Sequence, residues 1–235
     1  MKRTKSPGTV NKEALAGLST RIGQKLTVPE QVANALRDLI LNGDLKPGDA
    51  VVESVLAKQL SVGQPTVREA LKALEVEGLI ERQLNRGCTV MKLSADDLNK
   101  IYTLRQEWEP MAVEQALQHW TPEKAALLQQ AYAALTAARS VSRRAYYDAD
   151  LAFHRTIWEL ADNRYLVKAL NQIVLPIFAF LVIQLQKQPA FENDKNDLEH
   201  KEIADRMLAN DVAGAKKAMR QSLAHAGIVN ALKNL

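Results

Sequence analysis

The pattern of apolar residues predicts three short helices in the first part of the chain. Apolar side chains recur at the three- and four-residue spacing of one helix face in residues 29–42, in residues near 53–60 and in a helix that begins at Gln64. Pro29 and Gly43 mark the start and the end of the first helix. Three residues, 61–63, separate the second helix from the third, and Gly78 ends the third.

The run that follows Gly78, "LIERQLNRGCTVMKL", holds two short strand-like segments on either side of "NRG", which is typical of a hairpin turn. The order of elements is therefore helix, helix, tight turn, helix, hairpin. This order indicates a winged helix-turn-helix domain over residues 28–93, preceded by a basic, flexible arm at residues 1–27.

From about Ala95 onward the pattern is helical throughout, which predicts an all-α antiparallel bundle over residues 94–235 and a mainly α protein. Thr121 and Pro122 are typical of an N-cap followed by the first helical residue. Pro176 lies in an apolar stretch, where it should kink or break a helix.

Composition supports a cytoplasmic protein. The chain is 47% hydrophobic and 25% charged, and no apolar run approaches the ~20 residues that span a bilayer. The first residues contain no apolar signal-peptide core, and the single cysteine, Cys88, excludes an internal disulfide framework. Residues 1–93 hold 14 Lys and Arg against 10 Asp and Glu, whereas the remainder holds 17 of each, so the net charge of +4 lies in the N-terminal part. This charge suits contact with a phosphate backbone.

The third helix, within "SVGQPTVREALKALEVEGLI", carries its polar residues opposite its apolar face. Together with "VANALRDLILNGDLKPGD", "ESVLAKQL" and "RGCTV", this segment resembles the DNA-binding domain of GntR-family bacterial transcription regulators. The helical half resembles the FCD effector domain of the FadR-type subfamily. An α-helix fits the major groove of DNA, where base edges are distinguishable.

The resemblance implies that the third helix reads double-stranded operator DNA and that the hairpin is a wing. The candidate DNA-binding residues are Gln64, Pro65, Thr66, Arg68, Lys72, Arg86 and Gly87. Arg68 is the strongest candidate for a base or phosphate contact, and the alternative is an ordinary surface charge. The family often has a capping serine and an arginine where this chain has Gly63 and Gln64, so its operator should differ.

Two inward-facing histidines in the helical half form a candidate metal site. Asp150 and His154 are four residues apart on one helix face, and His200 aligns with apolar residues of a second helix. Such histidines can be core residues or ligands of a divalent ion. Many FCD domains bind zinc or a similar metal through Asp-x3-His and two further histidines, and the resemblance matches the first three. The last position falls on Ser222, and His225 is the alternative fourth ligand.

Two further residues are candidates for effector binding. Arg105 matches an arginine of many FCD domains and suits an organic acid, the alternative being a surface salt bridge with Glu109. Asn163 matches a frequent family asparagine that either caps a helix or contacts the ligand.

The sequence thus predicts a homodimeric transcription regulator, a repressor by family preference, that is controlled by a small carboxylate effector and a divalent metal, zinc being the first choice. One alternative is a metal-free FadR-type regulator that binds an acyl-type ligand. The other is a metal-dependent enzyme, although the sequence shows no nucleophile motif or phosphate loop beside the histidines. We expect no enzymatic activity and no membrane partner.

Overall fold

The computed structural model describes residues 26–83, 87–185 and 194–225. The chain folds into two compact units, and the main boundary between them falls between Lys92 and Leu93. Within the described residues, no helix is both long and apolar enough to cross a membrane. The predicted mainly α fold, a winged helix-turn-helix followed by a helical bundle, is confirmed.

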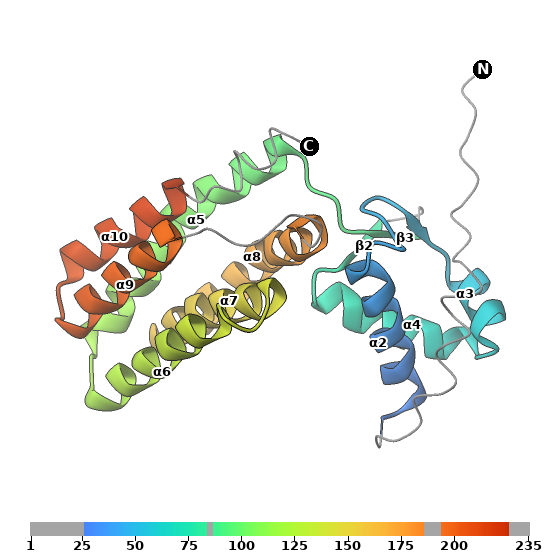
Figure 1. Ribbon diagram of the computed structural model, residues 1–235, viewed down its shortest axis with the longest axis horizontal. Helices are drawn as coiled ribbons and strands as arrows, with labels where there is room; N and C mark the ends of the chain where they lie inside the picture. The colour runs from blue at the N-terminus through green and yellow to red at the C-terminus, as the bar shows by residue number, and fades with distance from the viewer. Residues whose placement is uncertain (1–25, 84–86, 186–193, 226–235) are drawn as a thin grey trace. The chain divides into compact units, whose positions relative to one another are not determined.

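The first unit contains three helices and a small sheet (Figure 1). Its elements are α2 (Val28–Leu41), β1 (Ala50–Val51), α3 (Glu53–Leu60), α4 (Gln64–Val76), β2 (Ile80–Gln83) and β3 (Gly87–Val90). The sheet is antiparallel in the order β1-β3-β2. Arg82 lies opposite Cys88 in the β2–β3 hairpin, which we call the wing, and Ala50 of β1 lies opposite Thr89. The sequence pattern predicted the hairpin but not the third strand.

Local signals set the ends of these helices. Thr27 and Glu30 form a capping box at the start of α2. The turn between α3 and α4 contains Ser61 in the left-handed conformation, at φ 54°, and Gly63 precedes α4. Gly78, at φ 72°, follows α4 and allows the chain to enter β2. The tight turn therefore places the start of α4 directly after α3.

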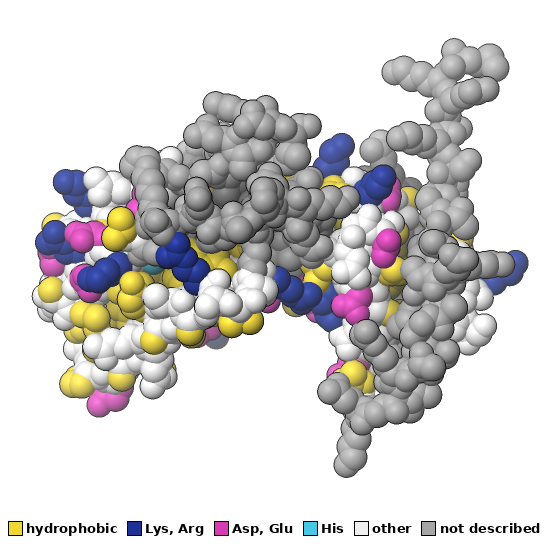
Figure 2. Space-filling view, in the orientation of Figure 1, with side chains coloured by type: hydrophobic (Ala, Val, Ile, Leu, Met, Phe, Trp, Pro, Cys, Tyr) yellow, Lys and Arg dark blue, Asp and Glu magenta, His cyan; other side chains and the backbone are white. Residues whose placement is uncertain are grey.

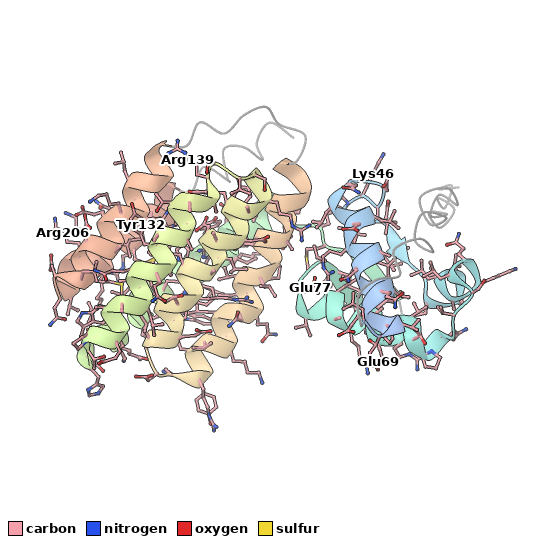
Figure 3. The ribbon with its side chains drawn as sticks, turned by 60° about the horizontal axis from the view of Figure 1, so that its bottom comes forward. Lys46, Glu69, Glu77, Tyr132, Arg139 and Arg206 are labelled. Atoms are coloured by element: carbon pink, nitrogen blue, oxygen red, sulfur yellow. The ribbon has the colours of Figure 1, made fainter. Side chains whose placement is uncertain are left out.

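The core of the first unit forms where α2 packs on α4. Leu36, Val67, Leu71 and Leu74 are buried, which leaves the opposite face of α4 exposed. The Arg37 guanidinium of α2 donates to both carboxylate oxygens of Glu77 at the end of α4; Figure 3 labels Glu77 beside α2 and Glu69 at the rim of the unit.

The second unit is entirely helical in its described residues. Its helices are α5 (Ala95–Gln118), α6 (Pro122–Ala138), α7 (Arg143–Leu160), α8 (Arg164–Leu185), α9 (Asp194–Leu208) and α10 (Val212–His225). The hydroxyl oxygens of Ser94, Thr121 and Ser142 each accept a backbone N–H three residues on and so cap α5, α6 and α7. These polar caps fix where the three helices begin.

Helices α9 and α10 pack together, α10 also packs on α5, and α6 packs on α7 and α9 (Figure 1). The contact between α5 and α7 completes a core around Val113, Phe153, Ile157 and Trp158, all fully buried. The visible outer face of this unit carries side chains of both charge signs among hydrophobic ones (Figure 2). The paired signs agree with the zero net charge of this part of the sequence.

The expectation for Pro176 needs correction in one respect, because α8 is not broken there. The helix continues from Arg164 to Leu185 with Pro176 inside it, and α5 likewise contains Pro110. Proline removes one backbone hydrogen bond of a helix. Leu170, Val174 and Ile177 of α8 are fully buried, and this packing offsets the loss.

Candidate metal centre and DNA-binding surface

Helices α7 and α9 bring three predicted metal ligands together in the core of the second unit. Asp150 and His154 come from successive turns of α7, and His200 comes from α9; all three are buried. The Nε2 atom of His200 lies 2.9 Å from Oδ1 of Asp150 and 3.3 Å from Nε2 of His154. Oδ1 of Asp150 lies 3.5 Å from Nε2 of His154. Oδ1 of Asp150 and the Nε2 atoms of His154 and His200 therefore face one another around a shared point that a metal ion could occupy.

The geometry of this triad fits a divalent cation. Zinc bonds to histidine nitrogen and carboxylate oxygen at about 2.0–2.1 Å, which puts neighbouring ligand atoms of a tetrahedron about 3.3 Å apart. The three measured separations, 2.9, 3.3 and 3.5 Å, lie on both sides of this value. Two imidazoles and one carboxylate are also ligands that several divalent metals accept.

Glu109 of α5, which is fully buried, orients His154. Its Oε2 lies 2.6 Å from Nδ1 of His154 and also accepts the indole N–H of Trp158, at 3.3 Å. Burial by itself raises the pKa of Glu109, but the Arg105 guanidinium and the His154 imidazole outweigh burial and lower that pKa to about 2. An ionised carboxylate only accepts hydrogen bonds, so Nδ1 of His154 donates to Glu109 and Nε2 is the ring atom that faces the triad.

Arg105 occupies a buried position beside this network. Its Nε donates to Oε1 of Glu109 at 2.5 Å, so the predicted pair with Glu109 forms, but inside the core rather than on the surface. The guanidinium carbon lies 5.1 Å from the ring centre of Tyr102 and 5.8 Å from that of Phe178. Burial lowers the pKa of Arg105, but the negative charge of Glu109 outweighs burial and the net shift is upward. Arg105 is thus a fixed cation in an apolar setting.

Tyr102, one turn before Arg105 on α5, carries a buried hydroxyl with no hydrogen-bond partner among the described residues. Burial raises the pKa of this hydroxyl to about 12, so it stays protonated. A buried O–H without a partner is costly. The hydroxyl is therefore suited to a polar ligand atom.

The remaining predicted residues of the second unit lie as follows. Ser222 is buried on α10, the helix that packs on α9 and α5. The side chain of His225 lies outside the described side chains. Asn163 caps α8, because its Oδ1 accepts the backbone N–H groups of Tyr165 and Leu166, and its Nδ2 donates to Gln115 of α5.

On the first unit, the exposed face of α4 carries most of the predicted DNA-binding residues. Gln64, Pro65, Arg68 and Lys72 are exposed, and Thr66 is half-buried. Lys72 pairs with Glu69 at 2.9 Å, while Arg68 pairs with Glu53 of α3 at 3.1 Å.

On the wing, Gly87 has φ +82°, and a Cβ added there would meet no atom within 4 Å. Arg86 lies outside the described residues. Glycine suits this positive φ, and the open surroundings leave its backbone accessible to a partner.

Sequence reasoning missed three residues of these sites: Glu53, Tyr102 and Glu109. Glu109 was considered only as a surface partner of Arg105, because its spacing to Arg105 is visible in the sequence and its contact with α7 is not. Its one detectable signal was its position on the apolar side of α5, next to Pro110 and Val113. Glu53 and Tyr102 carry no signal beyond their position near predicted site residues.

Comparison with known proteins agrees with both units. The family model for "Bacterial regulatory proteins, gntR family" matches residues 29–90, and the FCD domain model matches residues 100–225, which is more than half of the chain.

Among curated proteins, the probable D-xylose utilization operon transcriptional repressor of Paenarthrobacter nicotinovorans is 28% identical over 85% of this chain and 87% of its own length. The uncharacterized regulator YdhC of Bacillus subtilis is 28% identical over 61% of this chain and 65% of its own length. The solved structure of McbR/YncC from E. coli has a TM-score of 0.68 at 22% identity and covers 89% of this chain and 98% of that one. That structural likeness shows the fold.

Proposed function

Since the chain belongs to the gntR family of bacterial regulatory proteins and carries an FCD domain, we propose that a small carboxylate effector, bound together with a divalent metal, controls its affinity for operator DNA. Membership of this family makes the chain a DNA-binding transcription regulator and not an enzyme. The observation that carries this proposal is the buried Asp150, His154 and His200 triad in the same network as Arg105. Burial raises the pKa of Asp150, but the two imidazoles and Arg105 outweigh burial and lower it, which keeps the carboxylate ionised.

We assign the three residues of the triad as metal ligands, with zinc as the first choice. Ser222 or His225 is the candidate for a fourth ligand. A divalent ion held by these residues would supply a Lewis-acidic centre able to bind an effector oxygen. Glu109 fixes the ring of His154, and such partners of metal ligands typically change metal affinity by about 10–100-fold.

Arg105 and Tyr102 supply the protein groups for the effector. A guanidinium held between aromatic rings binds a carboxylate through paired N–H donors, and the Tyr102 hydroxyl lacks a partner among the described residues. Asn163 acts through the position of α8, which it caps, and contact with the effector is the alternative role.

We infer that the protein acts as a cytoplasmic homodimer. Two copies of α4 spaced about one DNA turn apart fit a pseudo-palindromic operator. The effector changes operator affinity only if it prefers one arrangement of the two DNA-binding units over another. Repression that the effector relieves is the favoured mode, since one relative is described as a probable repressor.

The test of the metal site compares two histidines. Elemental analysis of the purified full-length protein should find about one divalent ion per chain in the wild type. His200→Gln should lose that ion, whereas His119→Gln, an exposed histidine at the end of α5, should retain it. Equal metal content in both variants would show that the triad is not the site.

The test of the effector uses fluorescence anisotropy with a duplex that the protein selects from a random-sequence pool. A panel of small carboxylates should weaken binding of the metal-loaded protein, and chelation should abolish the response. A metal-free protein that responds to acyl-type ligands instead would establish the alternative regulator. No response to any carboxylate in the metal-loaded state would refute the effector class.

A further inference from the structure

One carboxylate of the first unit holds arginines from two different elements. Glu53 is the first residue of α3. Its Oε2 accepts from Nε and Nη2 of Arg68 on α4, at 3.2 and 3.1 Å, and its Oε1 accepts from Nη1 of Arg82 on β2, at 3.4 Å. Arg82 also lies 3.6 Å from Glu75, two turns beyond Arg68 on α4. The guanidinium groups of Arg68 and Arg82 are therefore held on the two oxygens of one side chain.

This arrangement lies on an accessible surface. The side chains of Arg68 and Arg82 are 50% and 38% exposed, and that of Glu53 is 21% exposed. The hydrogen bond from Arg68, followed by that from Arg82, lowers the pKa of Glu53, which is therefore ionised at neutral pH. Exposed ion pairs contribute little to folding stability. A network that links the start of α3, α4 and the wing strand therefore needs another explanation than stability.

We propose that Arg82 is a phosphate-contacting residue of the wing and that Glu53 is a positioning residue that orders Arg68 and Arg82 side by side before DNA binds. This inference rests on the proposed DNA-reading role of Arg68. Glu53 accepts hydrogen bonds from Nε and Nη2 of Arg68, whereas Nη1 makes no hydrogen bond within the described residues. One edge of the Arg68 guanidinium therefore stays available for DNA.

The charge of Glu53 also provides discrimination. A carboxylate at a DNA-binding surface repels phosphate, and this repulsion acts on every DNA sequence alike. Only an operator that engages Arg68 through a base edge compensates for it, because a good arginine–guanine pair distinguishes bases strongly. Glu53 should therefore weaken non-specific binding more than operator binding, which raises the ratio between them.

The experiment measures the affinity of the full-length protein, at several salt concentrations, for the selected duplex and for a shuffled duplex of the same length and composition. Arg82→Ala should weaken binding to both duplexes by a similar factor and reduce the slope of log affinity against log salt by about 0.9, the value for one lost phosphate contact. Arg82→Lys keeps the charge and should keep the slope.

Glu53→Gln should lower the ratio of selected to shuffled affinity by about threefold to tenfold, a part of what one base contact supplies. Its matched control is Glu81→Gln, which removes the same charge from the exposed residue before Arg82, on the opposite side of β2. A general effect of removing one negative charge would change the ratio equally in the two variants, and that outcome would overturn the positioning role.

The arginine variants separate this inference from the role of Arg68. An unchanged salt slope in Arg82→Ala would overturn the wing contact. If Arg68→Ala keeps the preference for the selected duplex, the proposed reading role of Arg68 fails, and the inference with it. If Arg68→Ala loses the preference while the Glu53 and Arg82 variants behave as wild type, only the inference fails.

Discussion

Replacing Glu109 with glutamine tests the buried network most directly. Glutamine has nearly the same shape, so the substitution removes charge without leaving a cavity. In the protein Glu109 is fully buried and faces buried Arg105 and His154. Removing one partner of a buried ion pair leaves the other charge uncompensated and costs about 3–5 kcal/mol.

The assay exploits the positions of the tryptophans. All three, Trp108, Trp120 and Trp158, lie in the second unit, so their fluorescence reports the unfolding of that unit. At about 2–4 °C per kcal/mol for a unit of this size, Glu109→Gln should lower the melting midpoint by roughly 6–20 °C. It should also weaken zinc binding by about 10–100-fold, because the ring of His154 loses its charged partner.

The matched control is Glu114→Gln on the same helix. Glu114 pairs with Lys216 at 2.5 Å, but its side chain is 45% exposed, so the substitution should cost about 0–1 kcal/mol and leave zinc affinity unchanged. If Glu109→Gln costs no more than this control, Glu109 does not serve as the buried counter-charge, and the account of the network is wrong.

Three further outcomes are expected. Ser94→Ala removes the cap of α5 and should cost about 1 kcal/mol in the tryptophan-detected urea transition, and an unchanged midpoint would contradict the capping. Leu71→Ala, in the fully buried core of the first unit, should lower the free energy of unfolding by about 2–5 kcal/mol. The urea concentration at which DNA binding is lost should therefore fall. A decrease in stability below about 1 kcal/mol would argue against tight packing around Leu71. Stripping the metal with a chelator should lower the melting midpoint of the second unit. The expected loss in stability is about 2.7 kcal/mol for a metal that was present at about 100 times its Kd. Zinc should restore the midpoint in the wild type but not in His200→Gln.

Signals that act within a few residues were readable from the sequence. The Thr121 cap and the glycine after α4 depend on backbone groups one turn away, so residue type alone indicates them. Asp150 and His154 share a helix face for the same reason, since their spacing fixes their relation once the helix forms.

Contacts between distant segments were not readable in the same way. Strand β1 is two residues long and exists only because β3 pairs with it. Helix α8 continues through Pro176 with Leu170, Val174 and Ile177 fully buried, and burial of this kind is a tertiary effect that no local pattern records. The resemblance to a family supplied His200 as the third member of the triad, whereas the apolar pattern around it indicated only an inward-facing histidine.

The sequence by itself determined most of the helices and the winged helix-turn-helix order, because apolar spacing and capping act locally, and it supplied the candidate residues for binding a metal or DNA. Only the tertiary structure decided that Glu109 is a buried counter-charge between Arg105 and His154, and that Glu53 joins Arg68 to Arg82. The physical reason is that the energy of a charge depends on its burial and on its partners, and both are set by helices and strands that are distant in the chain.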